Sequence, residues 1–128
     1  AAAERRLGQP EDDPVADARL VERALHQFDG FGRLQRWPSK RAVQTLALWG
    51  LWATFPAQTK LDEAAVNARL LDEHHFGDPA TLRRMMISAG LLTRNRDGSD
   101  YQRVAQKPPA EAAAVIRALS PLRRARDR

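Results

Sequence analysis

The 128-residue sequence predicts a mainly α-helical fold with a small β-hairpin, arranged as a winged helix-turn-helix core with extra N-terminal and C-terminal helices. Two observations predict it. Residues 78–104 have the pattern of one helix that runs directly into a hairpin. From Lys40 onward the expected order is helix, short strand, helix, turn, helix, strand, hairpin loop and strand, which is the order of a winged helix. With 43% apolar residues, the chain can form one ordinary core.

The N-terminal part is expected to supply one extra helix. Residues 1–12 are polar and lack a pattern, so we expect a loose segment followed by a single domain over residues 13–119. Asp13 and Pro14 form a helix start, with a capping side chain before a proline at the first helical position. Four apolar residues at helical spacing then predict an amphipathic helix over residues 15–28: Ala18, Val21, Leu25 and Phe28.

The next helix is expected over residues 40–55, with Ser39 as its N-cap. Its second half is apolar on every side, and such a helix is normally buried on every side. We therefore expect Trp49 and Trp52 to meet either another chain, in a homodimer formed through this helix, or the N-terminal helix. The alternative is that the N- and C-terminal helices of the same chain cover both rings.

A helix-turn-helix unit is expected to follow. Residues 59–61 can form a short strand, and Asp62 is expected to cap a helix over residues 63–74. The short connection after this helix contains Gly77, as the turn of a helix-turn-helix often does.

The second helix of this unit is expected over residues 78–89. Asp78 suits the N-cap, Pro79 the first helical position, and Gly90 the left-handed residue that closes many helices. Helical spacing divides its side chains between two faces. The inward face would hold Leu82, Met85, Met86 and Ala89, and the outward face Ala80, Thr81, Arg83, Arg84, Ile87 and Ser88.

A hairpin and a last helix complete the predicted domain. Asp97-Gly98 is a strong hairpin-turn signal, which makes residues 94–103 the wing. A final helix is expected over residues 110–119, ended by Ser120 and Pro121. Residues 120–128 would then form a mobile basic tail.

Charge is unevenly distributed along the chain. The net charge is +5, but residues 1–80 hold 10 Lys/Arg and 12 Asp/Glu, whereas residues 81–128 hold 11 Lys/Arg and 4 Asp/Glu. The basic part contains the second helix of the helix-turn-helix and the hairpin, which favours a polyanionic partner. The alternative is that the charge serves solubility alone.

Composition and motifs argue against several classes of protein. The sequence has no cysteine and therefore no disulfide or thiolate metal site, and we expect a cytoplasmic protein. Its longest apolar stretch, residues 46–55, is shorter than the roughly 20 residues that a membrane span needs. We find no Gly-rich phosphate loop, nucleophile elbow or suitably spaced acid pair, so we expect neither an enzyme nor a cofactor.

Several short motifs, in their order along residues 30–104, resemble an uncharacterised bacterial family, domain of unknown function 2087. The resemblance implies a winged-helix-like domain and brings no catalytic activity with it, and members of that family are commonly described as transcription regulators. One departure is that the Glu-Val-Asn of the family is Ala65-Val66-Asn67 here. The motifs are Trp37-Pro38-Ser39-Lys40, Val66-Asn67, His75 with Asp78, Leu82-Arg83-Arg84, Gly90-Leu91-Leu92 with Arg94, and Asp97-Gly98-Ser99 with Tyr101 and Arg103.

Arg83 and Arg84 are the main candidates for contact with DNA. An arginine on a recognition helix can bind guanine O6 and N7 together, which contributes about 1–3 kcal/mol of discrimination. Contact with phosphate would give affinity without sequence choice. The alternative is that one of the two pairs with Asp72, Glu73 or Asp78 and fixes the angle between the two helices.

The other candidates surround these two arginines. Thr81 and Ser88 face outward and could contact bases or phosphates, or stay solvated. Ile87 could meet a thymine methyl group, pack under the wing or belong to a protein interface. The hairpin arginines are predicted to reach phosphates or a narrow minor groove, the alternative being a solvated hairpin: Arg94, Arg96 and Arg103.

The adjacent histidines, His74 and His75, lie near Asp72 and Asp78 and suggest a metal site. Adjacent side chains on a helix point about 100° apart, and no third ligand follows at helical spacing. We therefore predict no metal, and expect His75 to cap a helix or pack in the core.

Two functions remain open at this stage. The first is a double-stranded-DNA-binding bacterial transcription regulator, dimeric, with the helix over residues 78–89 in the major groove and the wing over residues 94–103 on the backbone. RNA is a further possible partner for a basic winged helix. The second is a winged-helix protein–protein interaction module without nucleic-acid binding, which would use Trp49, Trp52 and Ile87.

Overall fold

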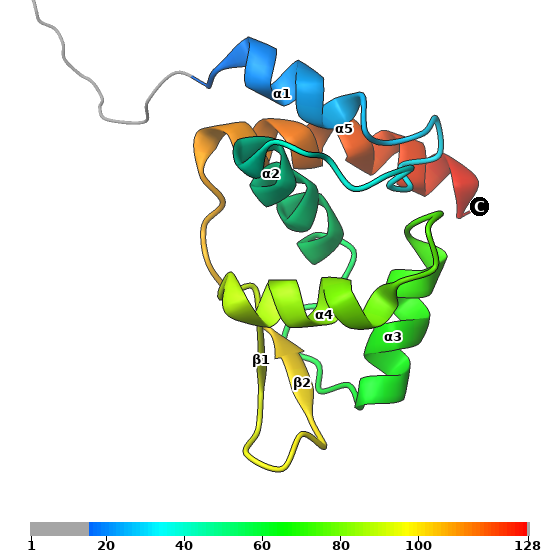
Figure 1. The fold of residues 1–128 in the computed structure, drawn as a ribbon, viewed down its shortest axis with the longest axis vertical. Helices are drawn as coiled ribbons and strands as arrows, with labels where there is room; N and C mark the ends of the chain where they lie inside the picture. Colours follow the sequence, from blue (N-terminus) through cyan, green and yellow to red (C-terminus); the bar gives the residue numbers. More distant parts are fainter. Residues whose placement is uncertain (1–15, 128) are drawn as a thin grey trace, which may run out of the picture.

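The computed structural model describes residues 16–127, which form helices and one two-stranded hairpin (Figure 1). The expected class, mainly α-helical with a small β-hairpin, is confirmed. The predicted loose segment over residues 1–12 and the helix start at Asp13-Pro14 lie outside the described residues. The elements are α1 (Ala18–Leu25), α2 (Arg41–Trp52), α3 (Glu63–Asp72), α4 (Pro79–Ser88), β1 (Leu92–Arg94), β2 (Tyr101–Arg103) and α5 (Ala110–Arg126).

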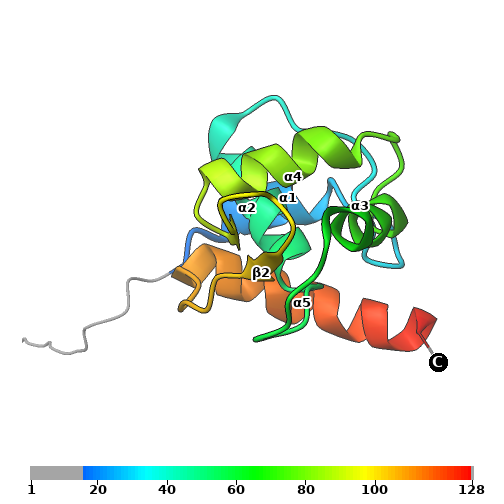
Figure 2. The same cartoon turned by 90° about the horizontal axis from the view of Figure 1, so that it is seen from below.

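Helix α2 is the centre of the core. It packs against α1 and α5 on one side and against α4 on another (Figures 1 and 2). Gly50 allows the closest approach, because a Cβ atom there would lie 2.9 Å from the ring of Phe28 and 3.2 Å from Leu119. Every residue of α2 from Leu46 to Trp52 is buried, as the all-round apolar pattern predicted.

Trp49 and Trp52 belong to this core. They are only 7% and 6% exposed, and their rings meet edge to face at 5.1 Å. The indole N–H of Trp52 donates to the carbonyl of Val104 at 3.0 Å. The expectation that these rings form an interface with another chain is therefore wrong. The alternative holds: elements of the same chain cover them.

Helices α3 and α4 both form, and a short connection joins them. Asp62 caps α3 through the N–H of Ala65, and Asp78 caps α4 through the N–H of Thr81. The buried ring of His74 joins the two helices: its Nδ1 lies against the carbonyl of Leu70, and its Nε2 accepts the N–H of Asp78. Because Nε2 accepts, the proton must be on Nδ1, so a neutral imidazole holds the turn.

The hairpin follows α4 after Gly90, which adopts the expected left-handed conformation at φ +76°. Its register pairs Leu92 with Arg103 and Arg94 with Tyr101. The strand expected over residues 59–61 is reduced to a single antiparallel bridge, in which Leu61 and Tyr101 exchange both backbone hydrogen bonds at 2.8 and 2.6 Å.

Two helix starts differ from the prediction. Ser39 does not cap α2; Lys40 occupies the N-cap position with extended backbone and no side-chain bond. Helix α1 begins later than predicted, and Asp17 caps it by accepting the N–H groups of Arg19 and Leu20. Lys40, next to Ser39, and Asp17 take the extended backbone that an N-cap needs.

Helix α5 corrects the prediction that the chain becomes a mobile tail after Ser120. It continues through Pro121 to Arg126, although proline inside a helix removes one hydrogen bond and costs about 3 kcal/mol. The guanidinium of Arg123 is buried and donates to the carbonyls of Gly32 and Gly50. These contacts hold the last two turns in place and offset the cost.

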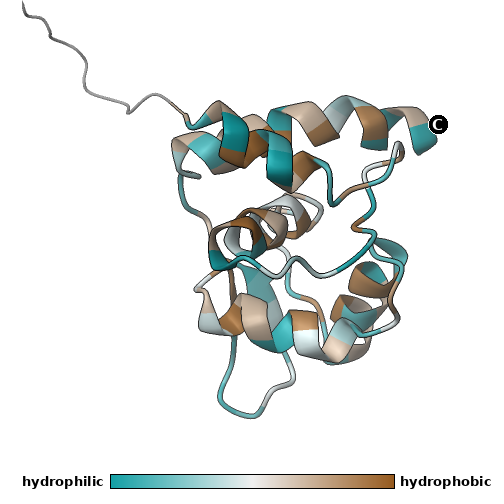
Figure 3. Cartoon of the chain, turned by 45° about the horizontal axis from the view of Figure 1, so that its top comes forward, coloured by the Kyte–Doolittle hydropathy of each residue, from teal (hydrophilic) through white to brown (hydrophobic). Residues whose placement is uncertain are grey.

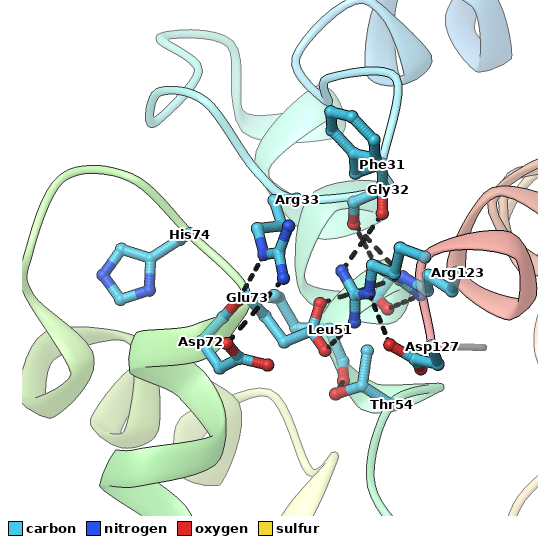
Figure 4. A network of polar contacts seen from close by, with 12 residues as sticks. Phe31, Gly32, Arg33, Leu51, Thr54, Asp72, Glu73, His74, Arg123 and Asp127 are labelled. Atoms are coloured by element: carbon cyan, nitrogen blue, oxygen red, sulfur yellow. Dashed lines mark hydrogen bonds and ion pairs between the residues drawn. The ribbon is translucent and has the colours of Figure 1, made fainter.

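A buried carboxylate completes this anchor (Figure 4). Glu73, at the end of α3, pairs with Arg126 and lies 4.0 Å from Arg123. Burial lowers the pKa of Arg123 to about 10, so the group remains charged at neutral pH. The C-terminal helix is thus tied to the helix that precedes the turn.

Candidate nucleic-acid interface

One face of helix α4 packs in the core, and the opposite face is exposed to solvent. Leu82 and Met86 are completely buried, as the helical spacing predicted, whereas Arg84 and Ser88 are exposed. Met85, Ile87 and Thr81 lie between these extremes, and Ala89, predicted to face inward, is exposed. The C-terminal end of α4 lies beside the hairpin (Figure 1).

A shallow hollow of about 320 Å³ separates α4 from the hairpin. Four of the predicted site residues line it together with Ile87 and Tyr101: Arg83, Arg84, Ser88 and Arg94. No carboxylate is among these lining residues. Thr81 lies in the first turn of α4 and Arg96 in the exposed hairpin loop, so the structure does not bring them into the hollow.

Arg83 does not face outward, which corrects the helical-face prediction. Its side chain is only 11% exposed, and its guanidinium donates to Asn67 Oδ1 and lies 3.9 Å from Glu63 Oε2. The hydroxyl of Tyr101 donates to the same glutamate at 3.2 Å. Arg83 therefore joins α4 to α3, as the alternative proposed, although its partners are not the predicted acids.

Arg103 also turns inward. Its guanidinium lies 4.2 Å above the ring of Trp52 and donates to the carbonyl of Phe55 at 3.0 Å. The expectation that it reaches out from the wing is wrong, because its place opposite Leu92 directs it toward the end of α2. It fastens β2 to the core.

The remaining arginines of the site are free to meet a ligand. Within residues 16–127, the side chains of Arg84, Arg94 and Arg96 make no hydrogen bond or ion pair, and all three are exposed. The hairpin loop is mostly hydrophilic (Figure 3). Its two arginines are balanced by Asp97 and Asp100, so the positive excess comes from the α4 side.

Two nearby carboxylates are ionised, and both already accept hydrogen bonds from residues close to them in the sequence. The hydrogen bonds from Thr81 lower the pKa of Asp78, which caps α4, with Arg84 adding a smaller effect. Bonds from Ser99 likewise lower the pKa of Asp97 in the loop. Both charges are partly satisfied by local N–H groups, which reduces their competition for the exposed arginines.

The structure describes no metal site. Among residues 16–127, no group of three or more His, Asp or Glu side chains could hold a metal. His75 is half exposed and pairs with Asp29 at 2.7 Å, which corrects its expected role in capping or core packing. The turn is instead held by His74. Over the same residues, no helix is both long and apolar enough to cross a membrane.

The sequence did not identify Asn67 and Glu63, which bind the side chain of Arg83, as part of this site. The available signal was the Asn of the motif on α3, but its spacing of 16 residues from Arg83 indicates no contact by itself. The buried carboxylate of Glu73 had no local signal, because its arginine partners lie on α5, at the far end of the chain.

The fold and site define a small helical domain with one hairpin, whose unpaired arginines gather beside one exposed helix. The chain belongs to a family described as an uncharacterized protein conserved in bacteria, domain of unknown function 2087, whose model matches residues 33–103. This confirms the resemblance. The match spans α2 to β2 and leaves α1 and α5 outside. Neither the curated proteins nor the solved structures include a match to the chain.

Proposed function

We propose that this protein is a winged-helix DNA-binding protein that regulates transcription in bacteria. The observation that carries the proposal is the hollow between α4 and the hairpin. Two of its exposed side chains, Arg84 and Arg94, have no hydrogen-bond or ion-pair partner among the described residues, and no carboxylate lines it. A surface of this kind attracts phosphate.

The dimensions of α4 suit the major groove of duplex DNA. Its 10 residues span about 15 Å, and the groove, about 12 Å wide, admits one helix. In this proposal Arg84 contacts guanine or phosphate, and Ser88 and Thr81 contact bases or backbone. Arg94 and Arg96 contact the flanking phosphates. Arg83 and Arg103 hold the surface in shape and do not touch DNA.

Binding to labelled random-sequence duplex DNA, measured by fluorescence anisotropy between 50 and 200 mM salt (about the range over which such complexes weaken steeply), tests the proposal. We expect log K to fall with log salt at a slope of about −4 to −5, from four to six phosphate contacts. A flat salt response, or no binding at low salt, would refute it.

A matched pair of variants separates this site from general charge. R84A/R94A should reduce the slope by about 2, since each lost phosphate contact contributes about 0.9. R117A/R124A removes the same charge from exposed positions on α5 and should leave the slope unchanged. Equal effects of both pairs would indicate attraction by net charge alone.

Protein–protein interaction is the second candidate function, through residues other than those expected. Trp49 and Trp52 are inside the core and cannot serve it. Exposed Phe31 and Leu71, at 59% and 54%, favour it instead. Absence of DNA binding in the experiment above would direct attention to this candidate.

A further inference from the structure

Two more hollows continue from the one between α4 and the hairpin. The first lies between the end of α4 and the start of α2; it shares Ser88 with the α4–hairpin hollow and includes Arg41. The second lies between α1 and the segment before α2; it shares Trp37 with the first and includes Arg36 and Lys40. The three hollows adjoin one another through these shared residues, and we call them together the track.

The charge of this track is one-sided. Its lining residues include no carboxylate but seven cationic side chains: Arg23, Arg36, Lys40, Arg41, Arg83, Arg84 and Arg94. Over residues 16–127, Arg83 alone among the seven has a side-chain hydrogen bond or ion pair. Elsewhere in residues 16–127, Arg33, Arg69 and Arg126 are bonded to carbonyl or carboxylate groups, whereas the exposed side chains of Arg19, Lys60 and Arg117 are not. Unpaired cations that gather without acids are poised for an external anion.

We infer that the part of the track beyond α4, with Arg36, Lys40 and Arg41, is a second phosphate-binding surface for the same DNA. This inference rests on the proposed function. A helix in the major groove has one phosphate backbone on each side. The hairpin lies on one side of the exposed end of α4 and the start of α2 lies on the other. The two sets of cations therefore match the two strands.

The second surface is also held in place before DNA arrives. Trp37, which lines both of its hollows, packs against the hydrophobic core. Lys40 is the N-cap residue of α2, so its position follows from the helix itself. The first turn of α2 has neither a side-chain cap nor an acidic residue, so nothing there opposes an approaching phosphate.

The test compares R36A/R41A with wild type, R84A/R94A and R117A/R124A in the anisotropy titration. Each pair removes two positive charges, and R36A/R41A takes one from each additional hollow. We expect R36A/R41A to make the salt slope shallower by about 2, as R84A/R94A does, while R117A/R124A has no effect. R36K/R41K, which keeps both charges, should keep the wild-type slope.

The outcomes distinguish this inference from the proposed function. A wild-type protein that does not bind duplex DNA at low salt would refute both. Normal binding with a wild-type slope for R36A/R41A, but a shallower slope for R84A/R94A, would overturn the second surface alone. If R36A/R41A is less folded by circular dichroism, R36Q/R41Q replaces it, and a wild-type slope in that variant overturns the inference equally.

Discussion

Substitutions of Arg83 and of Arg84, made one at a time, should have different effects: one on the stability of the fold, the other on DNA binding. The two residues are adjacent on α4, yet Arg83 is buried against α3 whereas Arg84 is exposed and makes no hydrogen bond or ion pair among residues 16–127. Arg83→Ala should destabilise the fold. Arg84→Ala should weaken DNA binding and leave the stability of the fold unchanged.

The size of the effect follows from the contacts of Arg83. A hydrogen bond from a charged donor, such as the one to Asn67, contributes about 1.5–3 kcal/mol. The ion pair with Glu63 adds less than about 1 kcal/mol, because that carboxylate is 53% exposed and screened by solvent. These terms are not additive, and we expect a loss of about 2–3 kcal/mol, or about 8–12 °C in Tm. Arg84→Ala should stay within about 0.5 kcal/mol of wild type.

Urea unfolding followed by circular dichroism measures both variants, and the anisotropy titration measures their binding. A double-mutant cycle with Asn67→Ala isolates the pair, and we expect a coupling energy of about 1–2 kcal/mol. Equal stability of Arg83→Ala and wild type, or an equal loss in Arg84→Ala, would refute the assignment of roles.

Three further outcomes test the fold. Pro121→Ala should raise the free energy of unfolding by up to about 3 kcal/mol in urea titration, because it restores a helical N–H; an unchanged value would contradict this cost. Glu73→Gln should lower it by about 3 kcal/mol, since two guanidinium groups lose their buried counter-charge; the argument fails if calorimetry shows no loss. Burial raises the pKa of Asp29, but bonds from His75 and backbone N–H groups outweigh it, so the pKa falls below 3.8. Its stabilisation is therefore present above about pH 4 and lost as pH falls through the lowered value. Unfolding midpoints of wild type and Asp29→Asn should then converge in acid, and a difference that persists there would rule this out.

The sequence predicted those parts of the fold in which a single residue type suits a particular backbone position, such as a helix N-cap or a left-handed turn. Asp62 and Asp78 cap their helices, and Gly90 and Gly98 take the left-handed conformation at φ +76° and +78°. Helix caps and tight turns depend on only three or four consecutive residues, so they can be recognised from one sequence without knowledge of the packed structure. Helices α3 and α4 and the hairpin could be predicted for this reason.

Contacts between distant residues explain where the prediction failed. Pro121 is a correct local stop signal, yet α5 continues because Arg123 reaches Gly32 and Gly50, which are 91 and 73 residues away. The all-round apolar pattern of α2 correctly predicted burial. It could not specify whether the covering surface came from the same chain, because periodicity contains no information about the partner.

The candidate site was predictable only in part, for a geometric reason. Side chains of adjacent helical residues point about 100° apart, so Arg83 and Arg84 rarely share an outward face. Which one turned inward depended on acceptors from α3, Asn67 and Glu63, and their position is a property of the packed structure. Arg84, Ser88 and Arg94 line one hollow, whereas Arg103 turns toward the carbonyl of Phe55 and away from the expected surface.

The residues that carried the family resemblance explain the architecture more than they explain the proposed binding. Asn67 and Arg83 join α3 to α4, and Tyr101 and Arg103 connect β2 to α3 and the end of α2. In this chain these contacts fix the positions of α4 and the hairpin, whatever the exposed side chains contact. The proposal of DNA binding therefore depends on different evidence: the cations that have no partner within the described part of the chain. For that reason, a binding experiment on Arg84 and Arg94 tests it, and a closer match to the family would not.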